Sequence, residues 1–233
     1  MGIFSSAGRV DDYLRPRGTK GFFRTAVNLS PETVQLQAHR TVSGAGGQLG
    51  LVLRDYQKSS RPVKVLNLFA YTGGATIAAA AAGAAVTHVD ASKGMVTWAK
   101  ENAVSSGLGD APIRWLVDDC AKFVEREIRR GNKYDGIIMD PPSYGRGPKG
   151  EIWKIEESIW PFIELTTQIL SDNAAFFLIN SYTTGLQPAV LSYMMNTAIT
   201  KRFGGHVEAD EIGLPVTESG LVLPCGASGR WQA

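Results

Sequence analysis

The chain has 233 residues, 44% of them apolar, and its only two cysteines, Cys120 and Cys225, stand far apart. This length and composition predict one sizeable domain, and they indicate neither a disulfide framework nor a zinc site. The chain has no run of about 18 uncharged apolar residues that would span a membrane and no apolar N-terminal stretch typical of a secretion signal. We therefore expect a cytoplasmic protein.

The net charge of +2 is unevenly spread along the chain. Residues 1–64 hold ten Lys and Arg against four Asp and Glu, whereas residues 65–233 hold fourteen against eighteen. Residues 1–62 are also rich in Gly, Ser, Thr and Arg and lack clear periodicity, which predicts a separate basic segment, either a divergent lid or partly disordered. Two interpretations of this segment stay open: it contacts nucleic acid, or it is a solvated leader.

From residue 63 to residue 233 the pattern predicts one folded domain. In chain order we expect strand 63–69, helix 74–83, strand 84–90, helix 92–107, strand 113–119, helix 121–131, strand 134–140, helix 155–170, strand 174–180, helix 187–201, and strands 206–213 and 219–224. Strands that alternate with helices in this way predict an α/β fold, in which a parallel sheet carries helices on both faces.

Ligands of such sheets bind beyond the carboxyl ends of the strands, so the residues after each strand are considered together. The five segments concerned are AYTGGA at 70–75, Asp90, Asp118–Asp119, DPPSYG at 140–145 and NSYTTG at 180–185.

Several of these residues suit a nucleoside that carries a charged tail. Gly73 and Gly74 allow the backbone to approach a ligand closely, and Asp90 is placed to accept hydrogen bonds from two ribose hydroxyls. Asp119 is placed to accept from an adenine amino group. Each residue also has an ordinary interpretation: the glycines form a turn, the acids cap helices, or Asp118 and Asp119 are solvated. Their recurrence at successive strand ends favours the ligand.

The type of nucleotide follows from what the first loop lacks. The chain contains no G-x-x-x-x-G-K-[ST] motif, and after the first strand it has YTGGAT in place of G-x-G-x-x-G. A short loop that carries Tyr71 and Thr72 offers few bare N–H groups to a diphosphate. The pattern therefore favours a nucleoside without phosphate, and S-adenosylmethionine fits this description.

Four segments resemble the class I S-adenosylmethionine-dependent methyltransferases: VLNLFAYTGGATIAAAAAGA, VTHVDASKGMVTWAKENA, WLVDDCAKFV and DPPSYGRG. Within that class they most resemble the bacterial large-subunit ribosomal RNA methyltransferases whose first motif is N-x-F-x-Y-T-G, and the likeness covers residues 63–233. The ending of the chain is similar to a shorter branch of that group. The resemblance implies a Rossmann-like sheet of seven strands, mostly parallel, with the last strand antiparallel.

The resemblance also implies the roles of individual residues. The methionine and sulfonium part of the cofactor would contact Phe69, Tyr71, Thr72, Gly73 and Gly74. Ribose would bind Asp90, with Ser92 and Lys93 beside it, and adenine would meet Asp119, with Cys120 behind the ring. No metal is expected.

The resemblance also implies a catalytic role for the D-P-P segment. In methyltransferases that act on amino nitrogens, a related motif places an acceptor beside the target, and here that acceptor would be Asp140. Pro141 and Pro142 would stiffen the backbone, because proline fixes its own φ. Tyr144 is a candidate for stacking on a base, although Ser143 displaces it by one position from the D-P-P-Y form.

The predicted reaction is transfer to a nitrogen, or to an oxygen. Methylation of cytosine at C5 needs a cysteine nucleophile, which relatives of that specificity carry after the fifth strand, whereas this chain has Asn180, Ser181 and Tyr182 there. We expect ribosomal RNA as the substrate and make no prediction of oligomeric state. Two alternatives stay open: a methyltransferase for a small molecule or protein, and a catalytically silent RNA-binding relative.

Overall fold

The computed structural model describes residues 62–183, 185–215, 219 and 221–233. The predicted basic segment 1–62 thus lies outside the described residues except for residue 62, and the division after residue 62 stays a prediction. Val63 is already buried, at 3% exposure, and begins the core.

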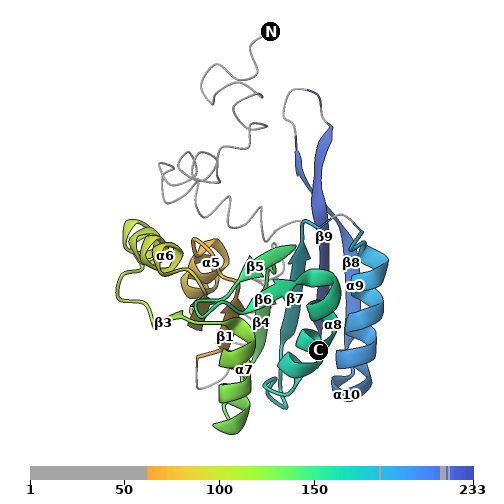
Figure 1. Ribbon diagram of the computed structural model, residues 1–233, viewed down its shortest axis with the longest axis horizontal. Coiled ribbons are helices and arrows are strands. Elements are labelled where there is room, and N and C mark those ends of the chain that lie inside the picture. The colour runs from red at the N-terminus through yellow and green to blue at the C-terminus, as the bar shows by residue number, and fades with distance from the viewer. Residues whose placement is uncertain (1–61, 184, 216–218, 220) are drawn as a thin grey trace.

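A seven-stranded sheet forms the centre of the described domain (Figure 1). Its order is β3 (Ile113–Val117), β2 (Ala85–Asp90), β1 (Lys64–Leu68), β4 (Gly136–Met139), β7 (Phe176–Ser181), β9 (Val222–Gln232) and β8 (His206–Pro215). The first five of these run parallel, and β9 lies antiparallel between β7 and β8. The predicted fold, seven strands with the last one antiparallel, is confirmed.

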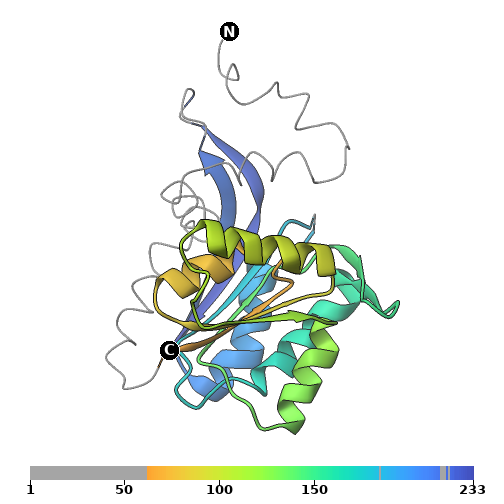
Figure 2. The same ribbon diagram turned by 90° about the vertical axis from the view of Figure 1, so that its left-hand side faces the viewer.

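Helices cover both faces of this sheet. Helices α5 (Gly74–Ala81) and α6 (Lys93–Ser105) lie together on one face, as Figure 2 shows. The other face is covered by α7 (Cys120–Arg129), α8 (Ile155–Thr167) and α9 (Pro188–Met195), and α9 continues through one π-helical turn, η1 (Asn196–Thr200), into α10 (Lys201–Phe203). No helix in the described part of the chain has the length and apolar character needed to cross a membrane.

The last strand differs from its predicted range of 219–224. It runs instead from Val222 to Gln232, through a glycine-containing stretch whose composition is typical of a loop. The reason is close packing: a Cβ on Gly226 would lie 2.2 Å from the Ser181 carbonyl oxygen, and one on Gly229 would lie 2.7 Å from the Met195 sulfur. These glycines let neighbouring chain approach the strand, so tertiary contacts outweigh their low strand propensity.

The segment around Arg146, shortly after the double proline, is a small hairpin. Strand β5 (Tyr144–Arg146) pairs antiparallel with β6 (Ile152–Lys154). Glu151 closes the turn, because its carboxylate accepts the Lys149 N–H at 2.9 Å and also pairs with Lys122 at the start of α7. The hairpin is therefore attached to the helix that follows β3.

Candidate functional site at the carboxyl ends of the strands

The segments that follow the parallel strands meet at one edge of the sheet. The Tyr71 N–H donates to the Asp90 carboxylate at 2.8 Å, and the Asp118 N–H donates to the Asp90 carbonyl at 3.0 Å. The Asp140 N–H donates to the Leu68 carbonyl at 3.4 Å. These bonds join the ends of β1, β2, β3 and β4 directly.

The fifth segment joins the same edge through side chains. The hydroxyls of Ser143, after β4, and Thr183, after β7, lie 2.7 Å apart. All five segments that the sequence grouped together are thus linked by hydrogen bonds, and the predicted convergence on one place is found in the structure.

The loop after β1 has a strained backbone. Phe69 and Tyr71 have φ of 54° and 49°, in the left-handed region that residues with a side chain rarely adopt. Such conformations cost on the order of 1–3 kcal/mol each and persist only where the surroundings impose them. Here the Phe69 N–H donates to the Cys120 sulfur at 3.3 Å, the Ala70 N–H to the Val89 carbonyl at 3.1 Å, and Tyr71 to Asp90. The ends of β2 and β3 therefore hold the loop in its shape.

Asp90 is the centre of this arrangement. One carboxylate oxygen accepts the Tyr71 N–H and the other accepts the Ser92 N–H, both at 2.8 Å. Burial raises the pKa of Asp90, and these two backbone hydrogen bonds oppose the rise. Each oxygen keeps a second lone pair, so the carboxylate has the acceptor capacity that a pair of ribose hydroxyls needs.

The two glycines of the loop differ in whether the structure has room for a larger residue in their place. Gly73 has a φ of 84°, and a Cβ there would lie 3.0 Å from the Ala99 Cβ, whereas a Cβ on Gly74 would have nothing within 4 Å. We expect Gly73→Ala to lower the free energy of unfolding by about 1–3 kcal/mol. Gly74→Ala is the matched control and should leave it nearly unchanged. Equal losses in chemical denaturation of the two variants would contradict this assignment.

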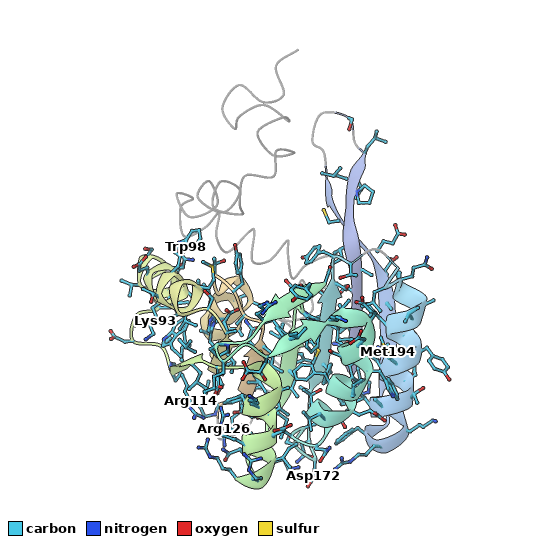
Figure 3. The ribbon with its side chains drawn as sticks, in the orientation of Figure 1. Lys93, Trp98, Arg114, Arg126, Asp172 and Met194 are labelled. Atoms are coloured by element: carbon cyan, nitrogen blue, oxygen red, sulfur yellow. The ribbon has the colours of Figure 1, made fainter. Side chains whose placement is uncertain are left out.

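Two predicted binding residues also cap helices. Ser92 accepts the Met95 N–H at 3.4 Å at the start of α6, and Asp119 accepts the Lys122 N–H at 2.9 Å at the start of α7. The capping interpretation of the acids is therefore confirmed for Asp119, where it occupies only one carboxylate oxygen, and the Ser92 cap is a further finding. Lys93 is exposed in the first turn of α6 (Figure 3). The roles of all three toward a cofactor stay predictions.

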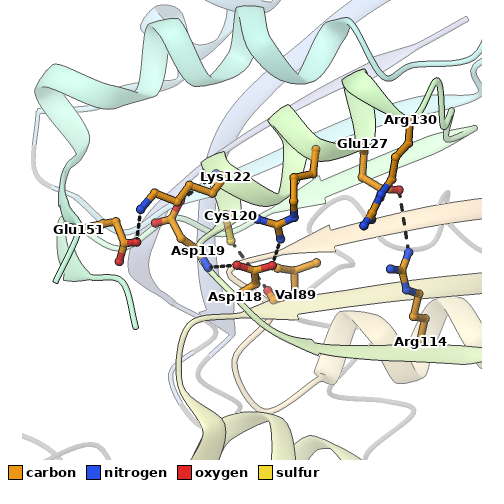
Figure 4. A network of polar contacts seen from close by, with 10 residues as sticks. Val89, Arg114, Asp118, Asp119, Cys120, Lys122, Glu127, Arg130 and Glu151 are labelled. Carbon is orange, nitrogen blue, oxygen red and sulfur yellow. Dashed lines mark hydrogen bonds and ion pairs between the residues drawn. The ribbon is translucent and has the colours of Figure 1, made fainter. Parts of the chain in front are cut away.

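The neighbouring acid, Asp118, is not simply solvated. It accepts the Asp119 N–H at 3.0 Å and forms an ion pair with Arg126 of α7 (Figure 4). These contacts fix the link between β3 and α7 and so fix the position of the Asp119 side chain.

Cys120 lies beneath the loops and not on their surface. Its side chain is buried in the core, at 3% exposure, and burial raises the pKa of the thiol far above its usual range. The neutral thiol accepts from Phe69 and lies 3.9 Å from the Val89 carbonyl (Figure 4). Its clear role is to connect the ends of β1 and β2.

Asp140 stands at the end of β4, where the chain turns into the double proline. Burial raises the pKa of its carboxyl from the usual 3.8 to about 7, and no hydrogen bond from a described residue offsets this effect. Pro141 is buried and Pro142 exposed. The carboxylate is thus an acceptor whose protonation changes near neutral pH.

The sequence patterns did not reveal the residue that fixes the double proline. The Trp153 indole N–H, from β6, donates to the Pro142 carbonyl at 2.7 Å, and its ring packs 4.8 Å from that of Phe69 and 5.4 Å from that of Phe162. The one local signal of this hairpin is the run EIWK after a Gly-Pro-Lys-Gly turn, and it is too short to show a clear alternation. Tyr144 is 54% exposed on the partner strand, so its ring is available for stacking.

Asn180 is a second residue to which the sequence patterns assigned no role in the site. It lies in β7 at 7% exposure, and its side-chain oxygen accepts a hydrogen bond from the Ser228 hydroxyl of β9 at 2.9 Å. This contact depends on the neighbouring position of two strands far apart in the sequence, which local patterns do not reveal.

Two hollows in the described surface lie away from this site. One hollow is lined in part by Asn132, Lys133 and Arg202, and another in part by Lys64 and Arg114, and both lie toward the opposite, amino-terminal edge of the strands. The described residues contain no group of three or more His, Cys, Asp or Glu side chains arranged to hold a metal ion.

Comparisons with known proteins agree with this architecture. Residues 39–152 match the model of a family described as S-adenosylmethionine-dependent methyltransferase. Among solved structures, the SAM-dependent methyltransferase of Agrobacterium tumefaciens is 40% identical with a TM-score of 0.72, over 78% of this chain and 60% of that chain. The chain is therefore similar to S-adenosylmethionine-dependent methyltransferases, and the predicted resemblance is confirmed.

Curated relatives carry a more specific name. The ribosomal RNA large subunit methyltransferase K/L of Shewanella frigidimarina is 34% identical over 119 residues, which are 50% of this chain and 16% of that protein. The protein of the same name from Methylococcus capsulatus is 37% identical over 94 residues, which are 40% of this chain and 13% of that protein. The chain thus spans less than a fifth of the length of these curated relatives.

Proposed function

We propose that the protein is an S-adenosylmethionine-dependent methyltransferase that methylates a nucleobase nitrogen of ribosomal RNA. The observation that carries the proposal is the convergence of Asp90 and Asp140 on one edge of the sheet, through the strained loop after β1. The names of the curated relatives support ribosomal RNA as the substrate. Such a substrate would be met in the cytoplasm.

The residues present fit the cofactor. Asp90 offers two acceptor oxygens to ribose hydroxyls, and Asp119 keeps one carboxylate oxygen free of its capping bond. The open surface at Gly74 gives room for the methionine part beside Tyr71 and Thr72. Three carboxylates lie at the carboxyl edge of the sheet, those of Asp90, Asp119 and Asp140. Their negative charge suits a ligand with a positive sulfonium. When bound, S-adenosylmethionine supplies an electrophilic methyl group, and the amino nitrogen that receives it loses one proton.

Asp140 would orient the amino group that receives the methyl. A carboxylate that accepts one N–H of an amino group turns the nitrogen lone pair toward the methyl donor, and positioning of this kind is most of what such a transfer requires. The Leu68 and Trp153 contacts fix the backbone on both sides of this residue. With a pKa of about 7, the carboxylate is also able to take up the proton that the nitrogen sheds.

The cysteines support transfer to nitrogen over C5 of cytosine. Cys120 is buried with a raised pKa, so it supplies little thiolate. Cys225 lies in β9, where its sulfur is 3.4 Å from the Leu223 carbonyl. The end of β7 carries Asn180 and Ser181, neither of which adds to a pyrimidine ring as a thiolate does.

One observation favours a second candidate. The acids at the carboxyl edge are unfavourable for RNA phosphates, and they favour a small uncharged or cationic acceptor. A methyltransferase of this kind would use the same cofactor residues, and it would leave RNA unlabelled.

Incubation of the full chain with radiolabelled S-adenosylmethionine and a bacterial cell extract, followed by separation of RNA, protein and small molecules, tests the proposal. We expect label in large-subunit ribosomal RNA, and labelling that is roughly 100-fold slower with Asp140→Ala. Label in the small-molecule or protein fraction alone would select the second candidate. Cofactor binding by calorimetry without any transfer would indicate a catalytically silent RNA-binding relative.

A further inference from the structure

The end of β4 brings Asp140 beside Asn180. The two parallel strands pair Met139 with Ile179, so the next residues along each strand are Asp140 and Asn180. Side chains alternate between the faces of a sheet, and Asp140 and Asn180 therefore lie on the same face as the pair before Met139 and Ile179. That pair, Ile138 and Leu178, packs in the cluster beneath α5.

Contacts further along the chain keep the two strand ends together. Three residues beyond this position, the hydroxyls of Ser143 and Thr183 still lie 2.7 Å apart. Asp140 and Asn180 thus lie between two contacts that join the same segments: the strand pair Met139–Ile179 before them and the Ser143–Thr183 hydrogen bond after them.

Ser228 sets the orientation of the Asn180 amide. Its hydroxyl donates to the Asn180 Oδ1 at 2.9 Å from β9, on the side of β7 away from β4. Because Oδ1 and Nδ2 diverge from the amide carbon, the contact of Oδ1 with β9 leaves Nδ2 facing away from that strand, on the side of β7 where β4 and Asp140 lie. The Asn180 side chain makes no other hydrogen bond to a described residue.

A donor and an acceptor therefore stand side by side at the methyl-transfer edge. We propose that Asn180, oriented by Ser228, determines specificity by donating a hydrogen bond to the ring nitrogen adjacent to the amino group that Asp140 accepts. This inference rests on the proposed function and narrows its substrate class. Asn180 would touch the base, and Ser228 is a positioning residue that acts through it.

The matching chemical group is an amidine edge, in which an amino group and a lone-pair ring nitrogen share one carbon. Adenine N6 with N1, cytosine N4 with N3, and guanine N2 with N3 all present this edge. Guanine N7 does not, because its neighbour O6 is a second acceptor. Uracil N3 and the ribose 2′-hydroxyl do not present it either. The target is thus an exocyclic amine.

The first test identifies the product. Unmodified large-subunit ribosomal RNA is transcribed in vitro, methylated with labelled S-adenosylmethionine, digested to nucleosides and analysed by mass spectrometry. We expect label on an exocyclic amino nitrogen. Label at N7, at a ring N–H, at carbon or at the 2′-hydroxyl would overturn the inference while supporting methyltransfer to RNA. Absence of label in RNA would defeat the proposed function itself.

The second test measures the contact. An oligonucleotide carries the identified target base, or its deaza analogue in which carbon replaces the ring nitrogen beside the amine. The analogue and Asn180→Ala should each lower kcat/KM roughly tenfold to hundredfold, as expected when a buried polar group loses its partner. Together they should cost little more than either alone, because both remove the same hydrogen bond.

Controls separate this contact from a loss of structure. Asn196→Ala removes a comparable amide that bonds Ser192 on the helix surface, and it should leave kcat/KM unchanged. Ser228→Ala should lower kcat/KM on the natural base and not on the deaza analogue, and Ser228→Thr should restore it. Additive losses for Asn180→Ala and the analogue would show that Asn180 has only a structural role.

Discussion

Asp140→Ala should lower kcat by roughly 100-fold or more, because misplacing the reacting groups costs about that much. The dissociation constant for S-adenosylmethionine should change little, since the residues proposed to hold the cofactor follow the other strands. Calorimetry measures the binding, and single-turnover transfer to the labelled RNA measures the rate. Asp172→Ala, an exposed acid labelled in Figure 3, is the control and should alter neither value. A parallel loss of binding and rate would refute the assignment.

The pH dependence of the rate provides a separate check on Asp140. Since burial raises its pKa to about 7, the acceptor form predominates only above that pH, and the rate should rise with pH and level off beyond about 7. Asp140→Asn keeps an acceptor oxygen without a proton to lose, so its weaker activity should be flat across this range. A wild-type profile that is already flat from about pH 5 to about pH 8 would show that the state of the carboxylate does not matter.

The free energy of unfolding should also depend on the Asp140 carboxyl, but it should fall as pH rises, whereas the reaction rate increases. The folded protein keeps the Asp140 proton up to about pH 7, whereas the unfolded chain releases it near 3.8. The folded state therefore binds more protons between these values, and the free energy of unfolding falls as pH rises through them. Asp140→Asn removes this fall, so the variant should gain stability over the wild type at high pH in chemical denaturation.

Asp90→Ala should have the reverse kinetic signature and weaken cofactor binding by roughly 100-fold, which corresponds to about 3 kcal/mol for lost charge-assisted hydrogen bonds. At saturating cofactor, kcat should fall much less. The variant also frees the Tyr71 and Ser92 N–H groups, so thermal unfolding without cofactor is measured alongside. Asp172→Asn, at an exposed acid outside the site, is the control and should leave cofactor affinity unchanged. Unaltered affinity in Asp90→Ala would rule out ribose binding at this residue.

Much of the fold and half of the site follow from local patterns. Alternating strands and helices require a parallel sheet, and the carboxyl ends of parallel strands share one edge. For this reason the sequence alone was enough to group Gly73, Asp90 and Asp140. The pattern also shows where each residue falls relative to its strand, which is enough to predict convergence.

Contacts between distant strands could not be predicted in this way. Asn180 meets Ser228 only because β9 inserts beside β7, and a strand rich in glycine gives no local sign of that pairing. Trp153 reaches Pro142 only through a hairpin of three-residue strands, which is too short for a clear alternation. The strain at Phe69 and Tyr71 is likewise imposed by partners on other strands, so their own residue types do not reveal it.

The insertion of β9 between β7 and β8 has a consequence for synthesis on the ribosome. Strand β8 emerges first, and within the described part of the chain it pairs only with β9. Until Val222–Gln232 has left the exit tunnel, β7 and β8 both expose unpaired backbone, which is the kind of edge that promotes aggregation. Nascent chains halted before Val222 are thus the form of this protein most in need of a chaperone.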